Sequence, residues 1–208
     1  MSIRLNGSTS GYAEIDSPAV GGNNTLILPG GNGNADQVLG GNGSGTLSWV
    51  DRGRMVLATA QNTTSGTAID FTGIPSWVKR IAVMFNGVST NGTSSCQVQL
   101  GTSSGFVITG YTSSSFHYNS NSAAASTTGL VIDQGGSAAA VRHGLVSVVL
   151  HSSNTWVESG TLLSSTNQNV TPSAGIIALG GTLDRLRLTT VNGTDTFDAG
   201  SVNILYEG

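Results

Sequence analysis

The stretch from residue 20 to residue 50 constrains this chain more than any other, because it is a glycine-rich repeat with few apolar side chains. A Gly-Gly-Asn unit begins at residues 21, 30 and 40, and a short apolar patch follows each unit. Self-similarity of this kind indicates a repeat architecture. Ordering a residue costs roughly 1–2 kcal/mol of backbone entropy, and glycine loses the most. The segment is therefore either disordered or ordered by identical partners. The regular apolar patches favour a thin, intertwined β segment that exists only in an oligomer.

Charged residues are scarce throughout the chain. They make up 9% of its 208 residues, against about 25% in typical globular domains. Serine, threonine and asparagine carry the polarity instead, together with 30 glycines. These residue types favour turns and β structure and disfavour long helices. The hydrophobic fraction of 38% still permits a core.

Several functional classes are disfavoured by the same composition. A net charge of −3 with scattered Lys and Arg gives no electrostatic footprint for nucleic acid. No apolar run is long enough for a transmembrane helix, so we expect no membrane insertion. The first residues lack the apolar core of a secretion signal, which is what we expect of a protein that is assembled in the cytoplasm. The single Cys96 excludes an internal disulfide framework.

A charge cluster at residues 51–54 marks the expected boundary between an N-terminal segment, residues 1–53, and a C-terminal domain, residues 54–208. Beyond it, short β-type runs alternate with turn signals such as Asn86-Gly87 and Asn192-Gly193. Gln97 and Gln99 should face away from a core formed by their neighbours. The run at 144–151 should form a hairpin with 155–163. We expect an all-β, antiparallel, jelly-roll-like β-sandwich. The strand candidates are residues 12–15, 55–60, 67–75, 78–85, 94–100, 106–108, 129–132, 144–151, 155–163, 175–180, 183–188 and 201–206.

Two blocks of the sequence resemble virion fibre proteins of tailed bacteriophages, particularly phages of marine cyanobacteria. The first contains Gly-Tyr-Ala-Glu-Ile-Asp-Ser-Pro-Ala at 11–19, Asn-Asn-Thr-Leu-Ile-Leu-Pro at 23–29 and Gly-Thr-Leu-Ser-Trp at 45–49. The second contains Phe-Thr-Gly-Ile-Pro at 71–75 and Met-Phe-Asn-Gly-Val-Ser at 84–89. The resemblance implies a homotrimer with a thin stalk and a globular β head. It also implies attachment to other virion proteins through the N-terminal segment and contact of the head with the host surface.

Motifs for catalysis and metal binding are weak. Residues 101–105 match a nucleophile elbow, with Asp133 and His143 following in the order of an α/β hydrolase, but no strand–helix unit surrounds them. The repeat lacks the carboxylates that a calcium site uses. The three histidines, His117, His143 and His151, show no metal-ligand spacing. We therefore expect no enzyme activity, no metal and no cofactor.

Residues 111–121 are the best candidates for receptor binding. They combine Tyr111, Phe116, His117 and Tyr118 with hydroxyls and amides, including Asn119. Aromatic faces pack on sugar rings, and amides match sugar hydroxyls. The competing interpretation, which is the favoured one, is that Phe116 and Tyr118 alternate inward on a strand and pack. The exposed loop at 86–93 is a second candidate through Asn91. Trp49, Trp77 and Trp156 should serve core or subunit packing.

The function expected from these features is that of a structural tail fibre of a virion, whose head recognises a host polysaccharide or protein. One alternative is a capsid-decorating, head-fibre or connector protein without a receptor role. The other is a polysaccharide depolymerase, whose catalytic carboxylates would pair in space and not in sequence.

Overall fold

The computed structural model describes residues 3–6, 10, 12–15, 25–35, 37–118, 121–166 and 168–208. These residues form strands, turns and loops without a helix, and all paired strands are antiparallel. They therefore contain no helix that could cross a membrane. The chain divides into two compact units, Met1–Arg52 and Gly53–Gly208. We call them the N-terminal unit and the C-terminal unit.

The N-terminal unit contains two separate hairpins. β1 (Ile3–Asn6) pairs with β2 (Tyr12–Ile15), and β3 (Gln37–Gly41) pairs with β4 (Leu47–Asp51). The indole N–H of Trp49, on β4, donates a hydrogen bond to the carbonyl of Gly31 at 2.7 Å. Its ring lies against Gly33, where a Cβ atom would come within 2.6 Å of the indole. Glycine in the repeat thus lets this tryptophan lie on the backbone.

Most apolar side chains of the second hairpin and its preceding segment stay accessible to solvent. None of the described residues of the N-terminal unit belongs to the buried core. A single bridge, Ile27 to Thr46, joins the preceding segment to the hairpin. A lone hairpin is marginal in water, and this one gains little from burial. The accessible apolar side chains, exposed by 38–69%, are Leu26, Ile27, Leu28, Leu39, Trp49 and Val50.

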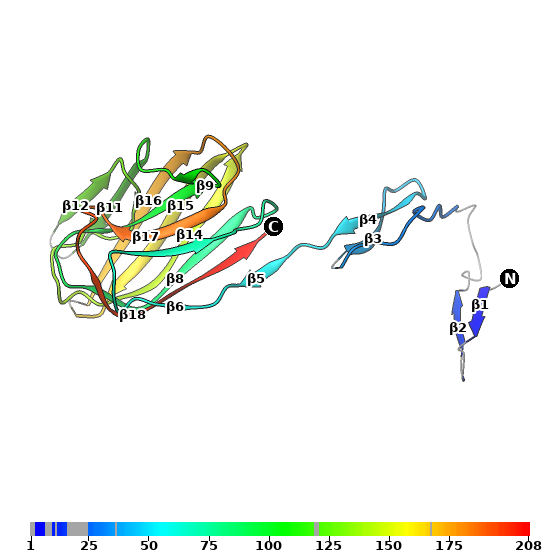
Figure 1. Cartoon of the computed structure of the whole chain (residues 1–208), viewed down its shortest axis with the longest axis horizontal. Coiled ribbons are helices and arrows are strands. Elements are labelled where there is room, and N and C mark those ends of the chain that lie inside the picture. The colour runs from blue at the N-terminus through cyan, green and yellow to red at the C-terminus, as the bar shows by residue number, and fades with distance from the viewer. Residues whose placement is uncertain are drawn as a thin grey trace. The chain divides into compact units, whose positions relative to one another are not determined.

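The C-terminal unit is built from two β-sheets that face each other (Figure 1). The larger sheet contains, in spatial order, β12 (Ser122–Ser126), β11 (Thr112–His117), β16 (Asn169–Ala178), β15 (Thr155–Ser164), β14 (Arg142–Ser152), β8 (Arg80–Thr90), β18 (Phe197–Glu207) and β5 (Met55–Leu57), with β6 (Gln61–Asn62) also paired to β18. The smaller sheet contains β10 (Gly105–Phe106), β9 (Cys96–Thr102), β17 (Arg185–Thr190) and β7 (Ala68–Thr72), with β13 (Leu130–Val131) also paired to β9.

The hydrophobic core lies between the two sheets. Alternate residues of each strand point inward, as the period-two pattern requires, and both sheets contribute to one buried cluster. Fully burying an aliphatic side chain of this kind stabilises the fold by about 1.5–3 kcal/mol. The sandwich interior thus holds the unit together. Its fully buried members include Ile81 and Val83 of β8, Val146 and Val148 of β14, Val98 and Leu100 of β9, and Leu186 and Leu188 of β17.

The expected hairpin between residues 144–151 and 155–163 is confirmed. β14 and β15 pair along their whole length, with Leu150 opposite Trp156 and His143 opposite Leu163. β16 continues the same meander beside β15. The turn at Asn192-Gly193 is also confirmed, with Gly193 at a φ of +68°.

The break expected at Asn86-Gly87 is wrong, because β8 continues through these residues to Thr90. Gly87 forms a β-bulge there, and the pairing register shifts on both sides of the strand, opposite β14 and opposite Gly200 of β18. Gly87 and Gly200 both have positive φ angles, +70° and +91°. The extra backbone N–H of the bulge donates to Nδ1 of His143 at 3.2 Å. An Asn-Gly pair thus bends a strand here instead of ending it.

Two further expectations need correction. Gln97 and Gln99 do point away from the core, but they are buried, because the segment after β12 covers them. The side chain of Gln97 accepts a hydrogen bond from Ser126, and Gln99 donates to the carbonyl of Thr128. In addition, residues 112–117 and 122–126, which are absent from the strand candidates, form the hairpin of β11 and β12.

The bulge generates a stability prediction. A Cβ atom at position 200 would lie 2.3 Å from the backbone carbonyl of Gly87, whereas a Cβ atom at Gly193 meets nothing within 4 Å. Both Gly200→Ala and Gly193→Ala should lose about 1–2 kcal/mol through left-handed backbone strain. Gly200→Ala should lose about 1–3 kcal/mol more through the clash. Chemical denaturation of both variants measures the difference, and equal losses would contradict the paired bulge.

Candidate binding surface at the loop end of the C-terminal unit

Several loops meet at the end of the sandwich remote from the chain's entry into the C-terminal unit. We call this the loop end. The opposite end is where Arg54 and Gly208 exchange backbone hydrogen bonds of 2.8 and 3.0 Å, so the chain enters and leaves the unit together. Figure 1 shows the C-terminus at that entry end, with β11 and β12 at the other. The loops of the loop end are residues 63–67, 91–95, 118, 133–141, 165–166 and 192–196.

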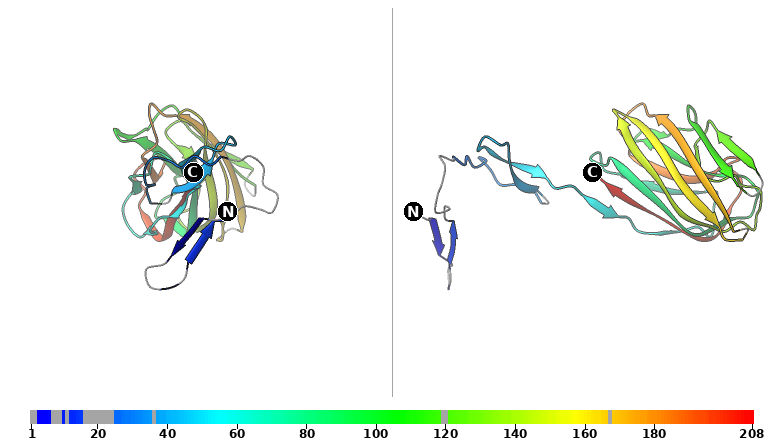
Figure 2. Two further views of the ribbon diagram at one scale, coloured as in Figure 1. Left: turned by 90° about the vertical axis from the view of Figure 1, so that its right-hand side faces the viewer. Right: turned by 180° about the vertical axis from the view of Figure 1, so that it is seen from behind.

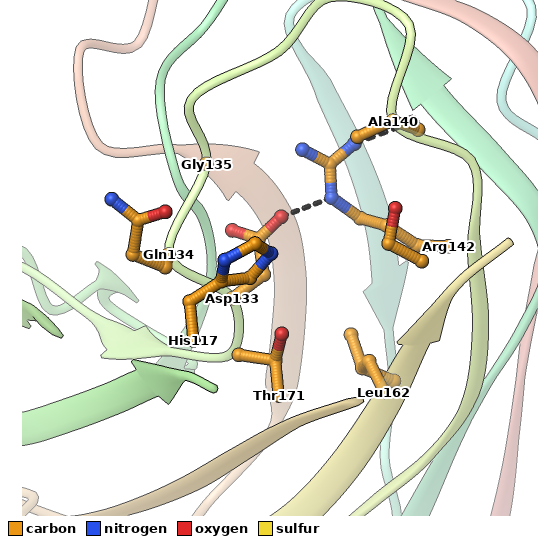
Figure 3. Close-up of a pocket in the computed structure, with 9 residues that line it drawn as sticks. His117, Asp133, Gln134, Gly135, Ala140, Arg142, Leu162 and Thr171 are labelled. Atoms are coloured by element: carbon orange, nitrogen blue, oxygen red, sulfur yellow. Dashed lines mark hydrogen bonds and ion pairs between the residues drawn. The ribbon is translucent and has the colours of Figure 1, made fainter. Parts of the chain in front are cut away.

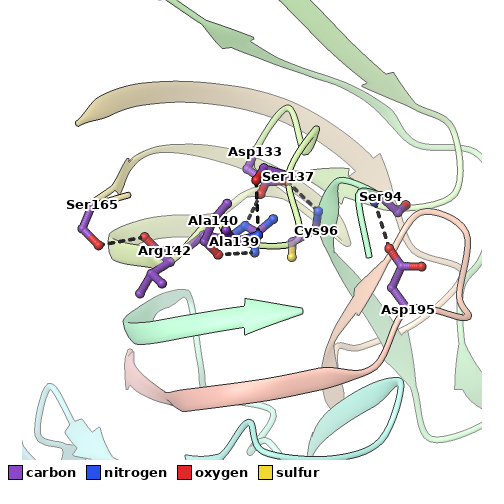
Figure 4. A network of polar contacts seen from close by, with 10 residues as sticks. Ser94, Cys96, Asp133, Ser137, Ala139, Ala140, Arg142, Ser165 and Asp195 are labelled. Atoms are coloured by element: carbon purple, nitrogen blue, oxygen red, sulfur yellow. Dashed lines mark hydrogen bonds and ion pairs between the residues drawn. The ribbon is translucent and has the colours of Figure 1, made fainter. Parts of the chain in front are cut away.

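Hydrogen bonds tie these loops to one another (Figure 4). Because the bonds link segments far apart in sequence, they hold the loop end in one arrangement without a ligand. Such pre-ordering reduces the entropy lost on binding. The linking bonds run from Gly136 N to Thr93 O at 2.8 Å, from Ser94 N to Asp195 Oδ2 at 2.9 Å, from Asn91 N to Thr196 O at 2.9 Å and from Ser165 N to Val141 O at 2.9 Å.

A buried ion pair lies beneath these loops (Figure 3). Arg142, at the start of β14, pairs with Asp133, and their residues are only 2% and 6% exposed. Asp133 also accepts a hydrogen bond from the backbone N–H of Cys96 at 2.6 Å. Arg142 donates a further bond to the carbonyl of Ala140 at 3.3 Å. Removing one partner of such a pair leaves an uncompensated buried charge, so the pair strongly specifies the loop conformation.

A small cavity adjoins the ion pair. Its volume is about 20 Å³, and His117, Arg142, Ser164 and Thr171 are among the residues that line it. That volume is close to the space needed by a single water molecule. The cavity therefore does not admit a sugar ring or a nucleotide, and any recognition at this end involves the outer surface of the loops.

Tyr111, a candidate for receptor binding, is unavailable to a ligand because it is 2% exposed. Its hydroxyl accepts a hydrogen bond from Leu100 N at 2.8 Å and donates to the carbonyl of Val107 at 3.0 Å. Burial raises the pKa of this phenol to about 12. Tyr111 thus fastens β11 to the smaller sheet.

Phe116 and Tyr118 form an aromatic pair at the end of β11. Their ring centroids are 5.3 Å apart in an edge-to-face arrangement, which is a favourable geometry. Phe116 is half-buried, whereas Tyr118 is 64% exposed. Phe116 therefore supports Tyr118, which presents an aromatic face to solvent at the loop end.

Two of the three remaining receptor-binding candidates, His117 and Asn91, lie at or beside the loop end. His117 is half-buried and shares a hydrogen bond with the side chain of Asn169. Asn91 is exposed, and its Oδ1 accepts a bond from Thr196 N at 2.9 Å. Asn119 lies outside the described residues. Within the described part, the structure thus gathers His117, Tyr118 and Asn91 at one end.

The residues of the nucleophile-elbow motif do not form a triad. Ser103 and Ser104 are the turn of the hairpin between β9 and β10, in which Thr102 pairs with Gly105. Asp133 contacts Cys96 at the opposite end of β9 and is paired with Arg142. The length of a seven-residue strand therefore separates Ser103 from Asp133. His143 binds the bulge at Gly87, as described above.

No group of three or more His, Cys, Asp or Glu side chains suited to a metal occurs in the described part of the chain. His151 is exposed and shares a hydrogen bond with Ser152. Asp36, the only carboxylate within the repeat, lies outside the described residues. Cys96 is fully buried, and burial raises the pKa of its thiol to about 12, so it is a poor nucleophile.

Glu158 is the most perturbed carboxyl group of the structure. It is 3% exposed, and its inward position on β15 places it inside the sandwich between Trp156 and Leu162. Ser173 donates a hydrogen bond to its Oε1 at 2.7 Å. Burial raises the pKa of Glu158 to about 7, against which the Ser173 bond acts only weakly. A carboxyl group with a raised pKa is typical of a general acid, but this one faces the closed core.

Sequence reasoning missed the ion pair and the loop at 133–141, and it predicted the turn at Asn192-Gly193 without its place at the loop end. Two signals for the ion pair were present in the sequence. Asp133 is an isolated charge directly after an apolar run, and Arg142 is an isolated charge before the strongest strand. Neither indicates a partner on its own.

No protein-family model, curated protein or solved structure matches this chain.

The position of Glu158 predicts a pH-dependent stability. Its pKa rises from an ordinary 4.5 to about 7 on folding, so the unfolded state loses the proton first as the pH rises. The fold should therefore be destabilised progressively from about pH 4.5, reaching a plateau above about pH 7. Glu158→Gln should raise the free energy of unfolding at pH 8 by up to about 3 kcal/mol and change little at pH 4.

Denaturation at the two pH values measures this difference. The control is Glu207→Gln, which removes a partly exposed pair with Arg80 and should change stability by less than about 1 kcal/mol at either pH. An equal gain for Glu158→Gln at pH 4 and pH 8 would contradict a raised pKa.

Proposed function

We propose that the protein is a structural fibre of a bacteriophage virion, homotrimeric through its N-terminal unit, whose C-terminal unit recognises the host surface at the loop end. The observation that most supports this proposal is the exposure to solvent of the apolar side chains of the N-terminal unit. The resemblance of residues 11–49 and 71–89 to phage fibre proteins supplies the virion context and the number of copies.

The N-terminal unit supports assembly because its apolar groups need a partner. Leu26, Ile27 and Leu28 are consecutive and 55–69% exposed, and Leu39 pairs across the hairpin with Trp49. Accessible apolar surface of this density on a two-stranded hairpin is unfavourable in water. Copies of the same segment would cover one another, since each presents the same apolar patches. The remaining length of this unit would dock to other virion proteins.

The loop end supports recognition because it is rigid, polar and remote from the N-terminal connection. Its loops are cross-linked by backbone hydrogen bonds, and Tyr118 supplies an exposed aromatic face. Exposed aromatics beside hydroxyls and amides suit the alternating apolar faces and hydroxyls of a polysaccharide. The adjacent cavity is too small for a sugar, so contacts would be shallow and individually weak. Three copies in each fibre, and several fibres on each particle, would multiply them.

The proposed trimer can be tested by measuring the mass of the protein in solution. Sedimentation equilibrium of the full chain should give three times the mass of one chain. Leu39→Asp would place a carboxylate in each copy of the shared apolar interior and should weaken assembly at least ten-fold, because burying an unpaired charge is costly. Ser48→Asp, on the same hairpin at an exposed polar position, is the matched control and should assemble normally. A mass of one chain for the unaltered protein would exclude the fibre.

The proposed recognition of a host polysaccharide by the loop end can be tested by a binding assay. Purified full-length protein should bind one or more immobilised bacterial surface polysaccharides, tested as a panel of lipopolysaccharides and capsular polysaccharides. Tyr118→Ser should reduce that binding about ten-fold, the order of loss typical when an aromatic contact residue is removed. Ser104→Ala, at the entry end, should bind normally. Absence of binding to any member of the panel, with the trimer intact, would favour a protein receptor or the capsid-decorating alternative.

A further inference from the structure

The outward face of the larger sheet is apolar and uncovered. Within the C-terminal unit, Figure 2 shows this sheet from its outer side in the right-hand view, with no other segment across its central strands. Its outward residues alternate with the core residues of β8 and β14–β16. Five of them, exposed by 37–44%, are Leu145, Val149, Leu163, Val170 and Ile176.

Strand register gathers these side chains into rows across the sheet. Val149 lies opposite Val157, and Val157 lies opposite Ile176. Leu163 lies opposite Val170 on the next strand, and small residues such as Ser147, Ser159 and Ala174 fill the row between. On the described strands of this face, the acidic and basic side chains lie toward its ends: Arg80 and Glu207 pair with each other at 3.5 Å near the entry end, and the exposed Asp198 of β18 accepts a hydrogen bond from Ser89 at the loop end.

The outward face of the smaller sheet differs in kind. Asp70 and Arg187 form two hydrogen bonds of 2.7 and 2.8 Å across adjacent strands, and Arg185 binds Asp184. The β12–β13 connection covers the glutamines of β9. An antiparallel sheet normally has one solvated, polar face. The smaller sheet meets that expectation, whereas the larger sheet does not.

The area of the apolar face is that of a protein interface. Five strands of this sheet, β8, β14, β15, β16 and β18, are ten or eleven residues long. Strands of about that length, spaced about 4.8 Å apart with 3.3 Å per residue, span roughly 800 Å². Each partner in a standard protein–protein interface buries about 800 Å². The face is therefore large enough to form such an interface.

We propose that this face is where the C-terminal units of neighbouring copies of the chain contact one another. The inference rests on the proposed assembly through the N-terminal unit. β4 ends at Asp51, and β5, an edge strand of the same larger sheet, begins at Met55. Three linking residues span about 10 Å, so assembled N-terminal units would hold the C-terminal units at millimolar effective concentration.

A second copy also fits the chemistry of the face. The central strands β14 to β16 direct no Asp, Glu, Lys or Arg side chain outward, so this part of the face offers nothing to a charged polymer or an anionic membrane. Identical copies of it meet without burying an unpaired charge. Met55 and Leu57 of β5, exposed by 67% and 60%, extend the apolar surface to the edge that the linker enters. Tethered copies would therefore meet this surface first.

Thiol labelling tests the proposal. Cys96 is fully buried, so an introduced cysteine is the single reactive thiol of the folded protein. Ser159→Cys is nearly isosteric and lies at the centre of the face, and Thr72→Cys lies outward on the smaller sheet; both positions are exposed in one chain. In the assembled protein, Ser159→Cys should react with a maleimide at least ten-fold more slowly than Thr72→Cys. The two rates should become equal in denaturant.

Adding the Leu39→Asp substitution, which is expected to dissociate the assembly, distinguishes failure of this inference from failure of the proposed function. With Leu39→Asp added, Ser159→Cys should become as reactive as Thr72→Cys in the dissociated fraction. Equal labelling of both thiols in a protein that sediments as a trimer would overturn the contact face and leave the fibre intact. A single-chain mass would overturn the fibre and, with it, the contact face.

Discussion

The structure depends on mutual coverage of two β-sheets. A strand directs alternate side chains to opposite faces, so a sheet buries its apolar residues only when a second layer covers one face. In the C-terminal unit, β7, β9 and β17 supply that second layer for the larger sheet. In the described part of the N-terminal unit, the hairpins have no second layer. The same physical requirement therefore produces a self-sufficient core in one unit and exposed apolar patches in the other.

Strong local patterns were sufficient to predict individual strands. The β-branched run at 144–151 and its hairpin partner follow directly from period-two alternation and a short turn. Asn86-Gly87 misled because a bulge and a turn use the same residues, and only the opposing Gly200 on β18 distinguishes them. The polar strands β11 and β12 are absent from the strand candidates for a related reason, although a strand containing Phe116 was one interpretation of this region. Their serines and alanines become strand residues through pairing with β16 and each other, which no local propensity reveals.

The candidate site shows the same division between local and long-range information. Aromatic and amide content identified the region that contains Tyr118, but it did not distinguish that exposed ring from Tyr111, which is buried. The distinction depends on backbone hydrogen bonds to Leu100, on β9 of the smaller sheet, and to Val107, directly after β10. The pairing of Asp133 with Arg142 depends on closure of the intervening loop. Residue types alone carry no signal for either contact.

Scarcity of charge connects the two units. In a protein with many ionised side chains, these side chains solvate the outer faces of the sheets. This chain has only eight basic and eleven acidic residues among 208. On the smaller sheet, Asp70 and Arg187 form a cross-strand pair. The outward residues of β14 to β16 and the described side chains of the glycine-rich hairpin include no Asp, Glu, Lys or Arg, and present Leu, Val, Ile and Trp instead. Hydroxyl and amide side chains lie among these apolar residues and reduce the exposed apolar area of both surfaces without removing it. In the proposed assembly, identical copies would cover both surfaces at once, because the short linker would bring the second surface together once the first is assembled.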